Sequence, residues 1–152
     1  IMLDLDNFKS FNDLSGHEAG DAVLREMGEL LRLSVRDGDI VCRYGGEEFV
    51  IIMPGASASI AEIRAEGLRS KTKALKVQHL GHMLGTITIS CGVAIFPDHG
   101  GTTSEVLRNA DAALYRAKQN GRDQVVLARP LSPQSPLDDR VTKMADPEIA
   151  RG

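Results

Sequence analysis

The sequence predicts an α/β fold, in which helices pack on a central mixed sheet of about five strands. Short apolar runs rich in β-branched residues alternate along the chain with longer runs whose apolar residues recur at the 3.6-residue period of a helix. A Gly-Gly pair between two of the short runs predicts a hairpin, because glycine accepts the positive φ angles of tight turns. Hairpin and crossover connections together give the element order βααββαβαβ.

The first half of the chain contains the first strand, two helices and the hairpin. In chain order these elements are expected at residues 1–6, 7–13, 17–35, 40–42 and 49–53. Asp6 is placed to cap the short helix, since a carboxylate just before a helix can accept hydrogen bonds from its free N–H groups. In the long helix Val23, Met27 and Leu31 recur at the helical period and predict one apolar face.

The second half adds two helices and two strands to the sheet. A helix, an irregular excursion, a long strand and a final strand are expected at residues 59–75, 76–85, 86–96 and 123–128, with the last helix before the final strand. Ser59-x-x-Glu62 and Thr102-x-x-Glu105 have the spacing of capping boxes, so each predicts a helix start. Gly121 ends the last helix, because glycine accepts the left-handed conformation of a helix C-terminus.

Composition places one domain at residues 1–128 and a disordered tail or linker at 129–152, which holds four of the six prolines. The chain opens inside a strand, so we expect an N-terminally truncated domain. The net charge of −3 gives no reason to expect a nucleic-acid partner, because proteins that bind polyanions usually carry a basic excess. No apolar run is long enough to span a membrane. Cys42 and Cys91 lie in apolar runs without Cys-x-x-Cys spacing, so we expect buried thiols in a reducing compartment.

Carboxylates gather at two strand ends. Asp4 and Asp6 alternate along the first strand and so share a face, while Glu47 and Glu48 follow the Gly-Gly pair where a second strand begins. Acids at adjacent strand ends repel one another unless a cation lies between them. Hard oxygen ligands with no nearby His or Cys suit Mg²⁺ and a phosphate-bearing substrate. For the hairpin alone, solvated surface acids remain the alternative interpretation.

Five spaced blocks of sequence resemble the GGDEF domain of diguanylate cyclases, here in the Gly-Gly-Glu-Glu-Phe form. The blocks are Asp4-Leu5-Asp6-Asn7-Phe8-Lys9, Asn12-Asp13, Gly16-His17, Gly20-Asp21 and Arg43-Tyr44-Gly45-Gly46-Glu47-Glu48-Phe49. Farther along, Ala110-Asp111, Leu114-Tyr115 and Ala117-Lys118-Gln119-Asn120-Gly121-Arg122 resemble the family's last helix and following turn. The resemblance covers residues 1 to about 128. It implies the palm-like fold shared by nucleotide cyclases and polymerases, and the condensation of two GTP into cyclic di-GMP with release of two pyrophosphates.

The resemblance also implies a metal site for two Mg²⁺ ions, with Mn²⁺ as a possible substitute. The matching ligand positions are Asp4, the backbone carbonyl of Leu5, Glu47 and Glu48. Glu47 is in addition the position of the proton acceptor. Lys9, one turn into the first short helix, is expected to reach a β- or γ-phosphate as the second catalytic residue.

The substrate contacts implied by the resemblance lie on the first two helices and at the end of the last one. Asn12 and Asp21 carry the donors and acceptors that a guanine edge needs. The remaining expected contacts are His17 near the ribose, the backbone amide of Phe8, and Lys118 and Arg122 on the triphosphate. Taken alone, cations at a helix C-terminus also suit the helix dipole, so that interpretation of Lys118 and Arg122 stays open.

Arg36-x-x-Asp39 has the spacing of the family's product-inhibition site, where cyclic di-GMP binds. Many relatives carry a second inhibitory arginine at the position of Gly67, so we expect weaker cross-domain inhibition. Each site holds one GTP and the product is two-fold symmetric, so a homodimer is expected in catalysis. The expected location is the cytoplasm, with any membrane anchor lying upstream. Two alternatives are a catalytically silent domain that senses GTP or cyclic di-GMP, and a cyclase with altered base choice.

Overall fold

The computed structural model describes residues 1–130, and the tail predicted from residue 129 falls almost entirely outside the described residues. The elements in chain order are β1 (Met2–Leu5), α1 (Phe8–Ser15), α2 (His17–Ser34), β2 (Ile40–Arg43), β3 (Glu48–Ile52), α3 (Ala58–Ala74), β4 (Gln78–His79), β5 (His82–Met83), β6 (Ile89–Val93), α4 (Thr103–Gln119) and β7 (Val125–Leu127). The predicted order is confirmed, and the excursion at residues 76–85 contains the small hairpin β4–β5.

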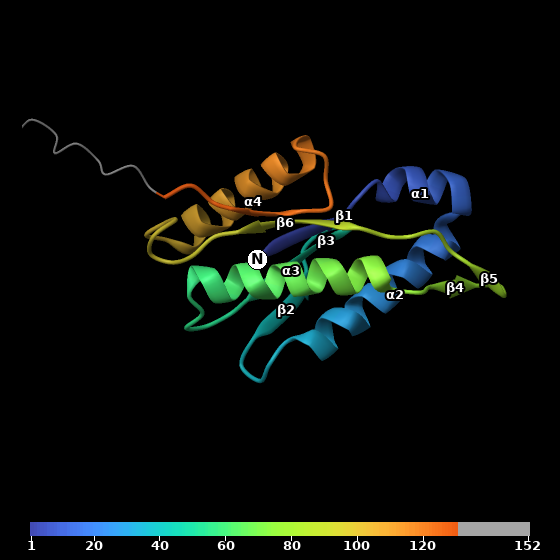
Figure 1. The fold of residues 1–152 in the computed structure, drawn as a ribbon, viewed down its shortest axis with the longest axis horizontal. Coiled ribbons are helices and arrows are strands. Elements are labelled where there is room, and N and C mark those ends of the chain that lie inside the picture. The colour runs from blue at the N-terminus through green and yellow to red at the C-terminus, as the bar shows by residue number, and fades with distance from the viewer. Residues whose placement is uncertain (131–152) are drawn as a thin grey trace, which may run out of the picture.

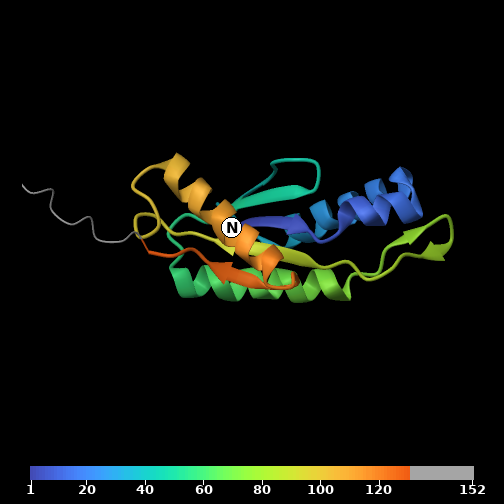
Figure 2. The same ribbon diagram turned by 90° about the horizontal axis from the view of Figure 1, so that it is seen from above.

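The main sheet has five strands in the order β2-β3-β1-β6-β7. All neighbours are antiparallel except β6 and β7, so the sheet is mixed as predicted. Helix α4 lies on one side of the sheet and α3 and α2 lie on the other (Figure 1; Figure 2). The β4–β5 hairpin projects at the end of the molecule where α1 meets α2. Within residues 1–130, no helix is long and apolar enough to cross a membrane.

The central strand β1 serves both helical layers, because successive side chains of a strand point to opposite faces. Leu3 and Leu5 are almost fully buried in the core that α2 and α3 cover. Met2 instead packs in the smaller core beside Leu114 of α4. Asp4 alternates with the leucines and therefore lies on the α4 side, where it is 4% exposed. A carboxylate thus interrupts the buried centre of the sheet.

Two helices match their predicted signals closely. In α2 the side chains of Val23, Met27 and Leu31 are fully buried, which confirms the predicted apolar face. At the start of α4 the Glu105 N–H donates to Thr102 Oγ1 at 3.3 Å and the Thr102 N–H donates to Glu105 Oε2 at 3.1 Å, so the capping box is confirmed. Farther along, α4 crosses β6 at Gly92 with its backbone against the glycine.

Two predicted helix caps are wrong. The cap of α3 is Ser57, whose Oγ accepts from the Ile60 N–H at 3.4 Å, and not Ser59 two residues later. The first short helix is capped by Asn7, which has a left-handed φ of 57° and makes no side-chain capping bond. Asp6 does not cap that helix, because its carboxylate accepts hydrogen bonds from neighbouring strand and loop residues instead.

The strand expected at residues 86–96 is shorter, and one cysteine lies differently from expectation. A strand extends only as far as its neighbours pair with it, and β1 pairs with β6 from Ile89 to Gly92. Cys91 in this central strand is buried as predicted, whereas Cys42 is exposed. Cys42 lies on β2, the edge strand, most of whose residues remain exposed.

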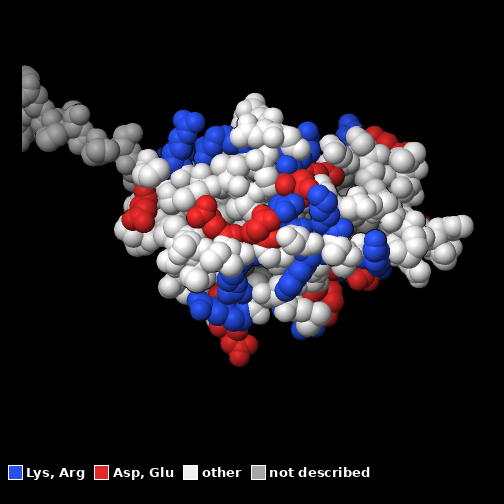
Figure 3. Space-filling model, in the orientation of Figure 1, with Lys and Arg blue, Asp and Glu red and all other residues white. Residues whose placement is uncertain are grey.

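The face seen in Figure 1 carries acidic and basic side chains mixed over α3 and the adjoining loops (Figure 3). Several of these charges form ion pairs, including Arg69 with Glu66 within α3. Mixed charge of this kind differs from the continuous basic stripe by which nucleic-acid binders hold phosphates.

Candidate active site

The candidate site lies where β1 ends beside the β2–β3 connection. Asp4 is the register partner of Glu48, and the Leu5 N–H donates to the Glu47 carbonyl oxygen at 3.2 Å. The pairing therefore brings the predicted metal positions Asp4, Leu5, Glu47 and Glu48 to one end of two adjacent strands. The first two of these residues are more than forty positions from the last two in the sequence, so the pairing of β1 with β3 is what joins them.

The β2–β3 connection spans residues 44–47, and its glycines serve a purpose other than the one predicted. Gly45 and Gly46 do not have positive φ angles, because a four-residue connection does not need the left-handed turn of a two-residue one. A Cβ on Gly45 would instead lie 2.6 Å from Glu48 Oε2, so glycine leaves room for that carboxylate. The Arg43 guanidinium donates to the Gly46 carbonyl and holds the connection in place.

Asp4 and the acids around it repel one another, and a lysine partly compensates. Lys118 Nζ of α4 lies 2.7 Å from Asp4 Oδ2. Burial raises the pKa of Asp4 above its usual range; Lys118 opposes this, and the charges of Glu48 and Asp6 add to it. Burial also raises the pKa of Glu47, reinforced by Asp4 and Glu48 and opposed by Lys118. The cluster therefore carries more negative charge than its one lysine neutralises.

This donor set fits a divalent cation that is shared with a phosphate ligand. Among residues 1–130, no three His, Cys, Asp or Glu side chains are grouped so as to hold a metal ion by themselves. Mg²⁺ is commonly held by one or two carboxylates, with substrate phosphates and waters filling its other positions. The Asp4 and Glu47 carboxylates and the Leu5 carbonyl are hard oxygen donors of this kind, and their excess negative charge favours a cation.

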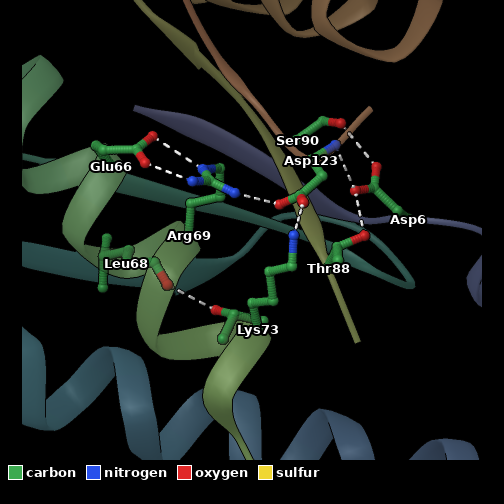
Figure 4. Close-up of polar contacts among 9 residues, drawn as sticks. Asp6, Glu66, Leu68, Arg69, Lys73, Thr88, Ser90 and Asp123 are labelled. Atoms are coloured by element: carbon green, nitrogen blue, oxygen red, sulfur yellow. Dashed lines mark hydrogen bonds and ion pairs between the residues drawn. The ribbon is translucent and has the colours of Figure 1, made fainter. Parts of the chain in front are cut away.

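Asp6 has a structural role and does not join these donors. Its carboxylate accepts hydrogen bonds from Thr88 Oγ1 at 2.8 Å, Ser90 Oγ at 2.7 Å and the Asp123 N–H at 3.0 Å (Figure 4). Ser90 lies on β6 and Thr88 directly precedes that strand, and their i, i+2 spacing is the sequence signal for two hydroxyls on one face. The contact with Asp123 spans 117 positions and has no local signal.

The predicted base and ribose contacts lie where α1 meets α2, at one end of the molecule (Figure 1). His17 and Asp21 are exposed, as is Lys9. Asn12 is partly buried, and its side-chain oxygen lies against Gly20 without a hydrogen-bond partner in the described part of the chain. Phe8 is buried and stacks on Phe11 with ring centroids 6.2 Å apart, so the contact predicted for Phe8 can come only from its backbone.

Lys118 reaches the cluster from the end of α4, and Arg122 follows four residues later. Lys118 contacts Asp4, as described above. Arg122 lies in the turn after the helix, where it has a left-handed φ of 65° and its N–H donates to the Ala117 carbonyl at 3.0 Å. The turn therefore has a defined backbone geometry, and the Asp123 N–H ties it to Asp6, two residues after Asp4.

Arg36 and Asp39 bind each other, and Asp39 also binds Arg64. Asp39 Oδ2 accepts from the Arg36 N–H at 3.2 Å and Asp39 Oδ1 accepts from Arg36 Nε at 3.2 Å, while Arg64 Nη1 lies 2.9 Å from Oδ2. Arg36 also donates to the Pro54 carbonyl at 2.9 Å. Burial raises the pKa of Asp39, but the bonds from Arg36 and the charge of Arg64 outweigh it and hold that pKa below its usual range. Sequence reasoning noted Arg64 but did not predict this contact.

Comparison with known proteins identifies the family. Residues 1–124 match the family described as "Diguanylate cyclase, GGDEF domain". The chain is 38% identical over 129 residues to Diguanylate cyclase A of Treponema denticola, covering 85% of this chain and 34% of that protein. It is 43% identical over 128 residues to Response regulator PleD of Caulobacter vibrioides, covering 83% of this chain and 28% of that protein. The chain therefore spans about a third of the length of the first relative and somewhat more than a quarter of the second.

Solved structures show the same fold. The GGDEF domain of DgcB from Caulobacter crescentus, in complex with c-di-GMP, superposes with a TM-score of 0.77 at 36% identity, over 83% of this chain and 74% of that one. The active GGEEF domain of a diguanylate cyclase from Vibrio cholerae gives a TM-score of 0.76 at 31% identity, over 86% of this chain and 81% of that one. The chain belongs to the GGDEF domain family of diguanylate cyclases.

Proposed function

We propose that this protein condenses two GTP molecules into cyclic di-GMP and two pyrophosphates. The observation that carries the proposal is the position of Asp4, a buried carboxylate at the end of the central strand beside Glu47 and the lysine of α4. Family membership over residues 1–124 supports it, and so does the relative from Treponema denticola, which is named Diguanylate cyclase A.

The proposed roles of the acids follow from their environments. Glu47 accepts the proton of the attacking ribose 3′-hydroxyl, and the burial that raises its pKa suits a general base. Asp4, Glu47, Glu48 and the Leu5 carbonyl would share two Mg²⁺ ions, with one or two carboxylates on each ion. When bound, Mg²⁺ supplies the chemistry of activating the hydroxyl and neutralising the triphosphate. Mn²⁺ offers the same oxygen coordination and is the expected substitute.

The proposed contacts to base and ribose lie where α1 meets α2, and the proposed contacts to the phosphates lie at the start of α1 and the end of α4. Asn12 and Asp21 hydrogen-bond the guanine edge, and His17 lies near the ribose. The first amides of α1, at Phe8 and Lys9, point from a helix N-terminus and so favour phosphate oxygens. The three cations expected on the polyphosphate are Lys9, Lys118 and Arg122. Lys118 already faces the carboxylate cluster, where phosphate and metal would meet.

Dimerisation is proposed because the product is two-fold symmetric while each site holds one GTP. Product inhibition is proposed at Arg36 and Asp39. Because Asp39 already accepts bonds from Arg36 and Arg64, cyclic di-GMP must replace these contacts in order to reach the Asp39 oxygens. Together with glycine at position 67, this supports inhibition weaker than in relatives with a second arginine.

The test is incubation with GTP and MgCl₂, followed by chromatographic separation of nucleotides. The protein is fused to a dimerising coiled coil, so that encounter of two copies does not limit the rate. Cyclic di-GMP should accumulate, and both Glu47→Gln and Asp4→Asn should abolish its formation. Arg36→Ala should let the reaction run further before it stops, with the initial rate unchanged.

A folded and dimeric sample that forms no cyclic di-GMP contradicts the proposal. Calorimetry with cyclic di-GMP then decides the remaining alternative. Binding that Arg36→Ala removes, without turnover of GTP, identifies a silent sensing domain. Formation of a mixed or adenine-containing product when ATP is added identifies a cyclase of altered base choice.

A further inference from the structure

The turn between α4 and β7 has an unusual backbone. Three successive residues have left-handed φ angles: 109° at Gly121, 65° at Arg122 and 44° at Asp123. Glycine adopts such angles freely, but side chains with a Cβ do so at a cost. Two such residues in a row persist only where surrounding contacts hold them, and these conformations are often found at functional sites.

Asp123 is held from two directions (Figure 4). Its carboxylate accepts from Arg69 Nη1 and from Lys73 Nζ, the latter at 2.6 Å, and both cations lie on α3. Its backbone N–H donates to Asp6 Oδ2 at 3.0 Å, just beyond the end of β1. We call Arg69, Lys73, Asp123 and Asp6 the turn clamp. It joins the turn after α4 to both a helix on the opposite face of the sheet and the strand that carries Asp4.

Both anchors of the clamp are themselves fixed. Glu66, one turn earlier on α3, accepts from Arg69 Nε at 2.9 Å and orients the guanidinium. Thr88 and Ser90 of the β6 region hold the Asp6 carboxylate. The network therefore has little freedom to follow a shift of the turn.

The ion pairs of the clamp are partly shielded from water. The side chains of Arg69 and Asp123 are 20% and 25% exposed. Burial raises the pKa of Asp123, but hydrogen bonds from Lys73 and Arg69 outweigh this and hold it below its usual range. The carboxylate is therefore charged at neutral pH. A shielded pair that shares one carboxylate between two cations constrains geometry more than an exposed surface pair does.

We propose that Arg69 and Asp123 are positioning residues for the nucleotide polyphosphate. They fix the Gly121–Asp123 turn so that Arg122, the neighbour of Asp123, is presented to the phosphates on the side of the site where Lys118 meets Asp4. This inference rests on the proposed function, because it assumes that GTP is the ligand of Arg122. It assigns a role to α3, which contributes none of the predicted substrate contacts.

Loss of the clamp should weaken GTP binding without removing a contact to GTP. Freed from Arg69 and Lys73, residues 122 and 123 would populate ordinary right-handed or extended conformations. The apparent dissociation constant rises in proportion as the binding-competent fraction falls, and a turn that is competent one-tenth of the time gives about a tenfold increase. The rate of the bound complex should change less, since the metal-site acids are untouched.

The variants are Arg69→Ala and Asp123→Asn, with Arg32→Ala as the matched control. Arg32 also lies on a helix and also binds the glutamate three residues earlier through Nε and Nη2, but in the described chain it has no second partner corresponding to Asp123. We expect KM for GTP, and Kd for a GTP analogue with a non-cleavable α–β bond, to rise about tenfold in the two clamp variants. Arg32→Ala should match the wild type, and kcat should change less than threefold in all three.

Two further measurements separate positioning from mere structural support. Arg69→Ala introduced into an Arg122→Ala background should add no further loss of analogue affinity, because the clamp acts through Arg122. Hydrogen exchange at the Asp123 amide should be faster in Arg69→Ala than in Arg32→Ala. Unchanged KM and Kd in both clamp variants, or losses that add in the double variant, overturn the inference.

The outcomes also distinguish this inference from the proposed function. A wild-type protein that forms no cyclic di-GMP but binds the analogue, and loses that affinity in the clamp variants, contradicts the cyclase proposal alone. A wild-type protein that forms cyclic di-GMP while the clamp variants bind GTP normally contradicts the clamp alone. A clamp variant that fails to fold is recognised by its thermal unfolding, and Asp123→Asn, which keeps the size of the side chain and the N–H donated to Asp6, then decides.

Discussion

The Asn12 amide and Gly20 are packed so closely that one methyl group should test base recognition. A Cβ at position 20 would lie 1.9 Å from Asn12 Oδ1 and 2.9 Å from Asn12 Cγ. Since C···O contacts lie near 3.3 Å even when close, Gly20→Ala must move the amide by more than about 1 Å. That displacement takes the amide out of reach of a guanine edge, while the metal-site acids at the end of β1 keep their positions.

The magnitude follows from the bonds that would be lost. An amide that makes two hydrogen bonds to the base contributes about 0.5–1.5 kcal/mol through each, so Gly20→Ala should reduce kcat/KM for GTP by about five- to 150-fold. Stability should change little by comparison. Alanine gains about 1 kcal/mol over glycine in a helix, whereas overpacking costs about 1–3 kcal/mol.

Gly28→Ala, on the same helix α2, is the matched control. A Cβ there meets no atom within 4 Å, so the variant should gain about 1 kcal/mol in urea unfolding and keep the wild-type kcat/KM. Steady-state kinetics on the dimerised protein compare the two. If Gly20→Ala has the KM and kcat of Gly28→Ala, Asn12 does not contact the base and the assignment of this end of the site is refuted.

Three further predictions concern the strands. Burial raises the pKa of Asp4 and Lys118 offsets this only in part, so the charged carboxylate is less favourable in the folded protein than in the unfolded chain. Asp4→Asn should therefore raise Tm at pH 7, with a gain that shrinks as pH falls toward 3.8. A lower Tm at pH 7 would contradict this. Gly92→Ala places a Cβ 2.0 Å from the Ala110 carbonyl oxygen, so α4 must move away from β6. The urea midpoint of unfolding should drop by the equivalent of about 1–3 kcal/mol. An unchanged midpoint would rule out so close a contact. Burial raises the pKa of the Cys91 thiol to about 12, so a thiol reagent at pH 8 should label Cys42 alone in the native protein and both cysteines in urea, as mass spectrometry would show.

The parts of the fold that could be predicted from the sequence depend on local chemistry. The capping box at Thr102 and the apolar period of α2 each involve residues within a few turns of one another, and the structure confirms both. The edge position of Cys42 could not be predicted in this way. An apolar run indicates that a strand is present, but the order of strands in the sheet decides whether its side chains are covered.

The same distinction between local signals and long-range packing applies to the candidate site. Spaced motifs identified Asp4 and Glu47, and the register of β1 with β3 brings the two strand ends together. The contacts of Asp6 with Asp123 and of Arg64 with Asp39 were missed, because each joins residues far apart in the chain. The sequence around a single arginine or aspartate does not indicate which distant residue it contacts. Such contacts become visible only after the helices are packed on the sheet.

The alternation of side chains along β1 has a consequence for how this domain can evolve. Leucines at positions 3 and 5 fill the core, and the carboxylate between them faces the candidate site. A single-residue insertion or deletion that shifted the pairing register of β1 by one would turn every side chain to the opposite surface, burying an acid among hydrocarbon and turning leucine toward the candidate site. Solubility and chemistry would then be lost in the same event. Natural variation in this strand should therefore consist of replacements, never of changes in length.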